Sequence, residues 1–157
     1  MRNEAVGLAL YFEQLIDSLE GRLGTLTALD MSMSPQQIQR FVDSVIAEGG
    51  VKAIYVLDPK GRVEYVALPE DAREARANVL GADLSRNPLL ASVRKLGRRA
   101  WSDRYLSALT GDATIGLAIP FDGYTLLGEV APGFASEMLQ AGTEDLVYPV
   151  LVVDRAG

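Results

Sequence analysis

Residues 51–68 read VKAIYVLDPKGRVEYVAL, and this stretch decides the fold. Apolar and β-branched residues fill both of its flanks, which predicts strands over 51–57 and 63–68. Between them, residues 58–61 read DPKG and predict a turn, because proline presets one backbone dihedral and glycine tolerates a positive one. The stretch therefore predicts an antiparallel hairpin at the beginning of a sheet.

Two helices are predicted before this hairpin. Apolar residues recur in steps of three or four from Leu8 to Leu26, which predicts one long helix with a single apolar stripe. Ser34 followed by Pro35 predicts the start of a second helix, and Gly49 with its neighbouring glycine is expected to end it. The expected buried face of this second helix comprises Ile38, Phe41, Val42, Val45 and Ile46.

A helical segment and three more strands are predicted after the hairpin. Residues 69–97 carry no strand pattern and favour short helices over 70–77 and 88–96. The three further strands are expected near 100–106, 114–120 and 124–130. This order predicts an α+β fold, in which helices pack on one five-stranded antiparallel sheet.

The strand and turn of residues 51–61 have a counterpart at the end of the chain. Valines and an aspartate over 147–154, followed by Gly157, repeat the spacing of the first strand, its aspartate and its glycine. Equal spacing indicates a repeated supersecondary unit, although any two buried strands that run into turns can look alike. A helix from Pro132 through Leu139 is expected before this second strand.

Composition excludes several classes of function. The chain has 157 residues, of which 48% are hydrophobic, and these suffice for the core of one domain. Its net charge of −6 opposes binding to the phosphate backbone of nucleic acids. It contains no cysteine and no histidine, which removes thiol nucleophiles, thiolate and imidazole metal ligands and the usual general base. We expect no metal site, no cofactor and no enzymatic activity in this domain.

In the order of its elements, the chain resembles the Cache sensor domains, which are extracytoplasmic relatives of the PAS fold. The resemblance rests on the long first helix and on the segments 54–61, 81–85, 101–103, 107–111 and 115–120. It implies a PAS-like sheet on which the long N-terminal helix packs, with the helical crossover forming a lid over the ligand.

The resemblance also implies a function and a domain organisation. It implies a periplasmic or extracellular ligand-sensing domain of an inner-membrane receptor, such as a histidine kinase, a diguanylate cyclase or a chemoreceptor. Residues 1–50 would be N-terminal helices and 51–141 the sensor unit, which is the membrane-distal unit in double Cache receptors. Residues 142–157 would be a linker and the first strand of a second unit.

The apolar stripe of the first helix leaves a second interpretation open. A narrow stripe can pair with its own copy, so the N-terminal helix is expected to form a homodimer in the full receptor. The alternative to a ligand sensor is accordingly a ligand-free dimerisation module.

Candidate ligand-binding residues gather on and around the predicted strand 100–106. Trp101, Asp103 and Tyr105 alternate, which would place them on one face of that strand. Aromatic rings supply apolar walls, and a carboxylate can bind an ammonium or a hydroxyl group. Core packing of the rings and solvation of the carboxylate are the alternatives. The complete set of candidates is Tyr55, Arg99, Trp101, Asp103, Arg104, Tyr105 and Ser107.

Basic residues are also concentrated near this strand. The cluster comprises Arg94, Lys95, Arg98, Arg99 and Arg104. Arg99 or Arg104 could bind a carboxylate through two parallel hydrogen bonds. Alternatively, the cations stabilise the carboxyl end of the helix 88–96 through its dipole.

The spacing of these residues departs from the amino-acid-binding members of the Cache family. Those members carry Arg-x-Trp on the lid, Tyr-x-Asp before a Thr-Gly turn, and an aspartate on the last strand. Here Ser107 replaces the first aspartate, and Arg99 with Trp101 lies too close to Tyr105 to occupy the lid. Glu129 lies one residue from the expected last position, which would turn it to the opposite face. We therefore expect the ammonium site to be absent, and either another ligand, such as a small carboxylate, or no ligand at all to bind.

Overall fold

The computed structural model describes residues 2–47 and 49–130 of the chain. The helix predicted at 132–139, the strand predicted from Val147 onward and the boundary at 141 lie outside these residues. No helix among the described residues has the length and apolar character that a membrane crossing requires.

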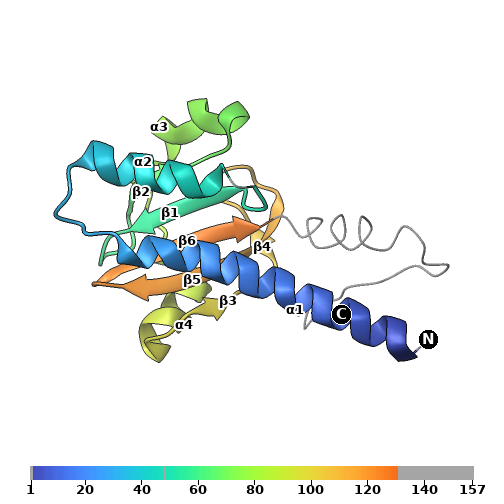
Figure 1. Ribbon diagram of the computed structural model, residues 1–157. Helices are drawn as coiled ribbons and strands as arrows, with labels where there is room; N and C mark the ends of the chain where they lie inside the picture. The colour runs from blue at the N-terminus through green and yellow to red at the C-terminus, as the bar shows by residue number, and fades with distance from the viewer. Residues whose placement is uncertain (1, 48, 131–157) are drawn as a thin grey trace.

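The described residues form one antiparallel sheet with helices on both faces (Figure 1). The strands lie in the order β2-β1-β6-β5-β3, and β4 pairs with β5 beside this path. Their bounds are β1 (Ala53–Leu57), β2 (Val63–Ala67), β3 (Ala100–Trp101), β4 (Tyr105–Leu106), β5 (Ala113–Phe121) and β6 (Tyr124–Val130). The predicted α+β class, with an N-terminal helix on an antiparallel sheet, is confirmed.

The sheet has six strands where five were predicted, because the expected strand 100–106 is broken into β3 and β4. The break occurs at Ser102. Its backbone N–H still donates to the carbonyl of Gly116 at 2.8 Å, but its Oγ, in place of its carbonyl, accepts from the N–H of Gly116 at 2.8 Å. The side chain thus replaces a strand hydrogen bond, and the backbone leaves the ladder until Tyr105.

Helices α1 (Arg2–Thr25) and α2 (Pro35–Ile46) cover one face of the sheet, which we call the helix face. A short 3₁₀ turn, η1 (Leu26–Ala28), follows α1. As predicted, Ser34 caps α2; it forms a reciprocal capping box with Gln37. Phe41 differs from the prediction, since its side chain is 40% exposed.

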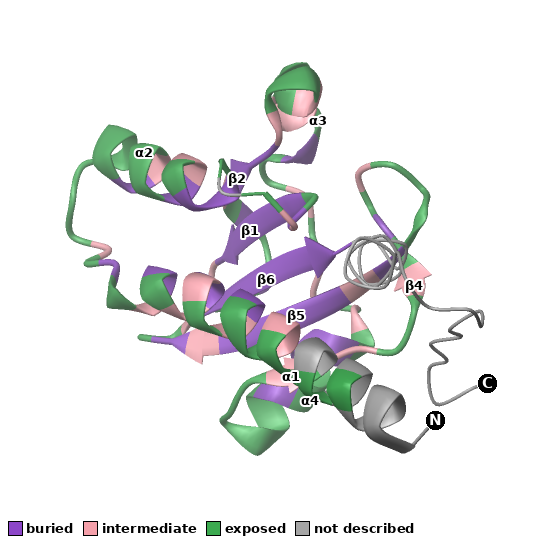
Figure 2. Ribbon diagram, turned by 45° about the vertical axis from the view of Figure 1, so that its right-hand side comes forward, coloured by how far each residue is buried: buried purple, intermediate pink, exposed green. Residues whose placement is uncertain are grey.

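The opposite face is covered by the crossover, and we call it the crossover face. The crossover consists of η2 (Glu70–Ala75), α3 (Arg76–Val79) and α4 (Pro88–Leu96). Figure 2 shows β1, β5 and β6 buried between these two layers, whereas the outer sides of α2, α3 and α4 are exposed. Neighbouring residues of β1 alternate between the layers, so that Ile54 packs on the helix face and Tyr55 on the crossover face.

The turn between β1 and β2 anchors the crossover to the sheet. The Asp58 carboxylate accepts the N–H of Lys60 at 2.8 Å and that of Arg62 at 2.9 Å, which closes the turn. Gly61 has a φ of 87°, and an added Cβ would lie 2.9 Å from the Cα of Ser85. Only glycine therefore fits where the turn meets the loop 81–85.

On the helix face, α1 lies close to β6. Leu19, Leu23 and Leu26 are buried, as the predicted stripe requires, while the side chains of Leu8 and Phe12 are outside the described set. A Cβ added to Gly128 of β6 would lie 2.5 Å from a Leu23 methyl carbon. The absence of a side chain at this position lets the helix settle directly on the sheet. The amino-terminal part of α1 continues past the sheet (Figure 1).

Candidate functional site

A buried carboxylate lies on the crossover face of the sheet. Glu129 of β6 is 3% exposed. Its Oε2 accepts hydrogen bonds from the hydroxyls of Tyr55 at 3.0 Å and Ser107 at 2.7 Å, and its Oε1 accepts from Tyr105 at 3.0 Å. Since Tyr55 packs with α3 and α4, the expectation that Glu129 faces the other way is wrong.

Among the described residues, the partners of this carboxylate are hydroxyl groups. Within the described residues, no lysine or arginine forms an ion pair with Glu129. Burial, and then the negative charge of Glu129 and the hydrogen bond to it, raise the pKa of the Tyr55 phenol well above its ordinary value. The same causes raise the pKa of Tyr105. Both phenols therefore remain protonated donors at neutral pH.

Gly116 of β5 provides the space that Tyr105 occupies. A Cβ added at Gly116 would lie 2.9 Å from the Tyr105 hydroxyl oxygen and 3.1 Å from a methyl carbon of Leu89. A larger residue would therefore push the phenol away from Glu129. Register supports this arrangement, because Gly116 is the partner of Glu129 in the ladder between β5 and β6.

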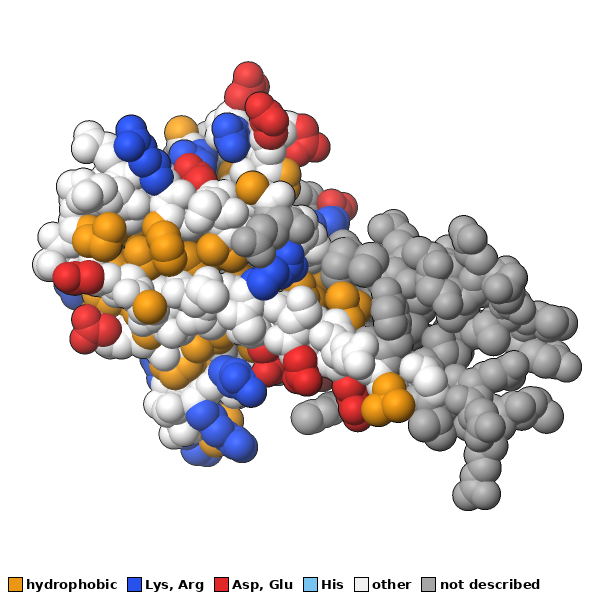
Figure 3. All heavy atoms as spheres, in the orientation of Figure 1, with side chains coloured by type: hydrophobic (Ala, Val, Ile, Leu, Met, Phe, Trp, Pro, Cys, Tyr) orange, Lys and Arg blue, Asp and Glu red, His pale blue; other side chains and the backbone are white. Residues whose placement is uncertain are grey.

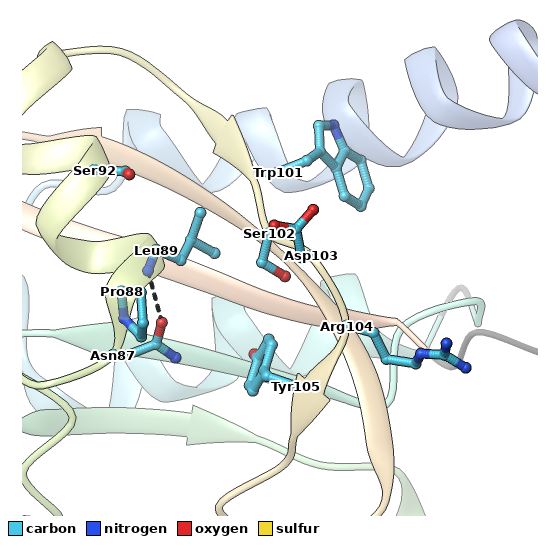
Figure 4. A pocket seen from close by; sticks show the side chains of 9 residues that line it. All are labelled: Asn87, Pro88, Leu89, Ser92, Trp101, Ser102, Asp103, Arg104 and Tyr105. Atoms are coloured by element: carbon cyan, nitrogen blue, oxygen red, sulfur yellow. Dashed lines mark hydrogen bonds between the residues drawn. The ribbon is translucent and has the colours of Figure 1, made fainter. Parts of the chain in front are cut away.

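A cavity of 310 Å³ lies between the first turns of α4 and the segment that joins β3 to β4 (Figure 4). Asn87 caps this helix, and its Oδ1 accepts the N–H of Leu89 at 2.9 Å. Tyr105 belongs both to the cavity wall and to the hydrogen-bonded group around Glu129, and so connects the two. The complete lining is Asn87, Pro88, Leu89, Ser92, Trp101, Ser102, Asp103, Arg104 and Tyr105.

The structure brings four of the seven predicted site residues together around this cavity. These are Trp101, Asp103, Arg104 and Tyr105. The Arg104 side chain points away from the other lining residues (Figure 4). Tyr55 and Ser107 contact Glu129 instead, and Arg99 lies outside the lining and pairs with Glu20 of α1 at 2.9 Å.

The prediction that Trp101, Asp103 and Tyr105 lie on one face of one strand is wrong, because the strand is interrupted at Ser102 and Asp103 lies between β3 and β4. The indole N–H of Trp101 donates to Glu20 of α1 at 2.8 Å, whereas the Tyr105 hydroxyl donates to Glu129 on the crossover face. The two polar groups thus point in different directions, that of Trp101 toward α1 and that of Tyr105 toward the crossover face.

Part of the basic cluster has a structural role. Arg94 and Lys95 lie in the last turn of α4, where cations complement the helix dipole, as the alternative interpretation predicted. The Arg94 guanidinium also donates to the carbonyl of Pro59 at 3.1 Å. This contact joins the helix to the turn between β1 and β2.

Sequence reasoning undervalued Glu129, although one signal was present. It is an acidic residue inside the otherwise uncharged strand YTLLGEV, and such a residue is seldom buried without partners. Its partners come from three separate strands or loops, so spacing alone did not reveal them. Glu20 and Ser102, which anchor the cavity wall, gave no comparable signal.

A second hollow lies between α2 and the edge strand β2. It has a volume of 430 Å³ and is more open to solvent. Its lining comprises Pro35, Gln36, Gln39, Arg40, Glu64, Tyr65 and Leu80. Glu64 and Arg40 are exposed, and the lining includes none of the buried polar residues described above.

No protein-family model matches the chain, and no curated protein matches its sequence. Solved structures match it in fold. An extracellular ligand-binding receptor from Desulfohalobium retbaense is 12% identical with a TM-score of 0.69, over 85% of this chain and 26% of that one. The ligand-binding domain of the Pseudomonas aeruginosa amino acid chemoreceptor PctB, in complex with L-Gln, is 13% identical with a TM-score of 0.66, over 85% of this chain and 55% of that one.

A third structure has the same fold. The ligand-binding domain of the Campylobacter jejuni chemoreceptor Tlp3, in complex with L-valine, is 16% identical with a TM-score of 0.63, over 89% of this chain and 61% of that one. The chain thus spans between about a quarter and three fifths of these three chains. Its fold is that of extracellular sensory domains, and the resemblance to Cache sensors is confirmed at the level of the fold.

Proposed function

We propose that this chain is an extracytoplasmic ligand-sensing domain of a transmembrane signalling receptor. The observation that carries the proposal is a cavity on the crossover side whose wall, Tyr105, is hydrogen-bonded to the buried carboxylate of Glu129. The fold shared with chemoreceptor sensory domains supports it. Catalytic output, from a histidine kinase, a diguanylate cyclase or a chemotaxis pathway, would belong to another part of the receptor.

The chemistry of the site favours a ligand with a cationic group. Glu129 is buried without a cationic partner among the described residues and is linked to the cavity through Tyr105, and Asp103 places a carboxylate in the cavity lining itself. An ammonium group nearby would supply the missing positive charge. The structures of PctB with L-Gln and Tlp3 with L-valine show that domains of this fold accommodate amino acids. A small amino acid therefore fits best, and this proposal departs from the sequence-based expectation of an absent ammonium site and of another ligand, such as a small carboxylate.

A thermal-shift screen tests this proposal. The probes are the twenty L-amino acids and γ-aminobutyrate, each at about 5 mM, since a ligand that binds only the folded state raises the melting temperature. We expect at least one to stabilise the protein. Ser92→Tyr, which fills the cavity from α4, should abolish the shift, whereas Ala91→Tyr on the exposed side of α4 should retain it. A screen without a stabiliser, or an equal shift in Ser92→Tyr, contradicts the proposal.

A ligand-free dimerisation module is the second candidate function. The amino-terminal part of α1 extends past the sheet (Figure 1), and Leu10, in the first half of this helix, is 54% exposed. Pairing of two copies of α1 would bury such a residue. Sedimentation should then show a dimer that Leu10→Glu dissociates and Glu13→Gln preserves. A monomer at all concentrations removes the support for this second function in the isolated chain.

A further inference from the structure

One carboxylate of α1 binds two residues at the edge of the cavity. Glu20 Oε1 accepts the indole N–H of Trp101 at 2.8 Å, and its Oε2 pairs with Arg99 at 2.9 Å. The Glu20 side chain is 14% exposed, whereas that of Arg99 is 61% exposed. Both carboxylate oxygens of a largely buried side chain are therefore engaged by the strand segment that forms the cavity wall.

The two bonds differ in strength. A charge-assisted hydrogen bond in a partly buried place is one of the stronger side-chain interactions. An ion pair with an exposed partner contributes little, because solvent screens it. The bond from Trp101 is therefore the main link between α1 and the cavity wall, and Arg99 reinforces it.

The surrounding charges favour this contact. Figure 3 shows basic side chains gathered over the end of the molecule that holds α4 and β3, and acidic side chains along the adjacent part of α1. The basic residues Arg98 and Arg99 immediately precede β3, and Asp17 lies one helical turn before Glu20. Basic and acidic side chains thus lie near one another at this junction, where Glu20 pairs with Arg99.

We propose that Glu20 is a positioning residue of the ligand site, which fixes the indole of Trp101 and so couples the cavity to helix α1. This inference rests on the proposed function and extends it, because it adds a residue of α1, Glu20, to a ligand site formed by α4 and the segment between β3 and β4. A ligand that displaced Trp101 would weaken its hydrogen bond to Glu20, and with it the contact between α1 and the cavity wall. By reciprocity, a shift of α1 would change the affinity of the cavity.

The positioning role can be measured without any ligand, because Trp101 is the single tryptophan of the chain. Its emission maximum and its quenching by acrylamide report how the indole is held. Glu20→Leu removes the acceptor and should shift the emission to the red and increase quenching. Arg99→Gln removes only the ion pair and should stay close to wild type, whereas Glu20→Gln keeps an acceptor oxygen but loses the charge that strengthens the indole hydrogen bond, so its shift should be smaller than that of Glu20→Leu. Glu13→Gln, an exposed change on the same helix, is the matched control.

The coupling to α1 has a separate readout in hydrogen exchange. Trp101→Phe keeps an aromatic ring but cannot donate to Glu20. Amides of residues 17–24 should then exchange about tenfold faster, which is the effect expected from losing a hydrogen bond to a charged group. Amides of α2 should keep their wild-type rates, which distinguishes a local release of α1 from a general loss of stability.

Two results would overturn the inference. One is an unchanged Trp101 emission in Glu20→Leu together with unchanged α1 exchange in Trp101→Phe. The other is a shift in Arg99→Gln and Glu20→Gln as large as in Glu20→Leu, which would make the ion pair the link. Neither readout uses a ligand. A failed amino acid screen would therefore contradict the proposed function, whereas the positioning role of Glu20 is decided by the fluorescence and hydrogen-exchange results alone.

Discussion

The two faces of the sheet are covered by different kinds of contact. On the helix face, α1 and α2 pack on the sheet through a cluster of buried hydrophobic residues that includes Leu23 and Ile54. On the crossover face, a similar apolar cluster adjoins the buried group of Glu129, Tyr55, Tyr105 and Ser107. Burying a carboxylate costs free energy that apolar packing would avoid. The comparison indicates that the helix face mainly stabilises the fold, whereas the crossover face holds the buried polar group beside the cavity in which we propose that a ligand binds.

The largest expected loss of stability follows from a substitution on the helix face. Leu23→Ala removes a fully buried side chain at the position where α1 meets Gly128, and it should lower the free energy of unfolding by about 3 to 5 kcal/mol. Leu10→Ala, on an exposed part of the same helix, should change it by less than about 0.5 kcal/mol. Urea denaturation measures both. Equal effects of the two variants would refute the packing that we describe for α1.

The next effect concerns the buried carboxylate. Glu129→Leu deprives three hydroxyl groups of their acceptor and should cost about 2 to 4 kcal/mol, because buried unpaired donors are unfavourable. Glu64→Leu on β2 changes an exposed glutamate of a strand and serves as the control. If Glu129→Leu leaves the free energy of unfolding unchanged, the three hydroxyl groups have other partners, and the fold does not depend on the buried carboxylate of the crossover face.

A smaller effect is expected for single hydroxyl groups around Glu129. Tyr55→Phe removes one of the three donors and should destabilise the protein by about 1 to 2 kcal/mol. Tyr65→Phe removes a hydroxyl that does not contact Glu129 and should be close to neutral. In the Glu129→Leu background, Tyr55→Phe should lose most of its effect, since the two groups act together. Additive losses would show that the pair is not coupled.

The smallest effect at neutral pH concerns ionisation of the phenols. The pKa values of Tyr55 and Tyr105 are raised in the folded state by burial and by Glu129. Their contribution to stability is therefore complete below the ordinary tyrosine pKa of about 10, and it is lost as the pH rises toward the folded-state values. Absorbance at 295 nm should show their ionisation only together with unfolding. Ionisation of both phenols near pH 10 in the folded protein would contradict the buried arrangement.

Local signals predicted the parts of the fold that local chemistry determines. The Asp122-Gly123 pair between β5 and β6 is a sequence signal for a two-residue hairpin, and both residues have positive φ values, as such a turn requires. Ser34 and Pro35 predicted the start of α2, which has the expected cap. The hairpin over 51–68 and the helix 88–96 were likewise predictable, because the spacing of apolar residues within a short segment distinguishes a strand from a helix.

The site was less predictable, because it depends on contacts between distant residues. The break at Ser102 arises from its hydroxyl bond to Gly116, and alternation along 100–106 gave no sign of it. The orientation of Glu129 follows from the register of β6 between β1 and β5, which the sequence does not specify. Phe41 fits the helical period of α2, but the sequence did not reveal that its side chain lies at the edge of the interface.

Mapping a bound ligand onto the two hollows tests the central claim most directly. The measurement is a ¹H–¹⁵N NMR titration with the amino acid that gives the largest thermal shift. We predict saturable shifts of amides in 87–92 and 101–105, around the cavity beside Tyr105, with little change at 35–40 and 64–65. Shifts confined to the hollow between α2 and β2, or no saturable shift with any of the amino acids, would contradict the assignment of ligand binding to the crossover face.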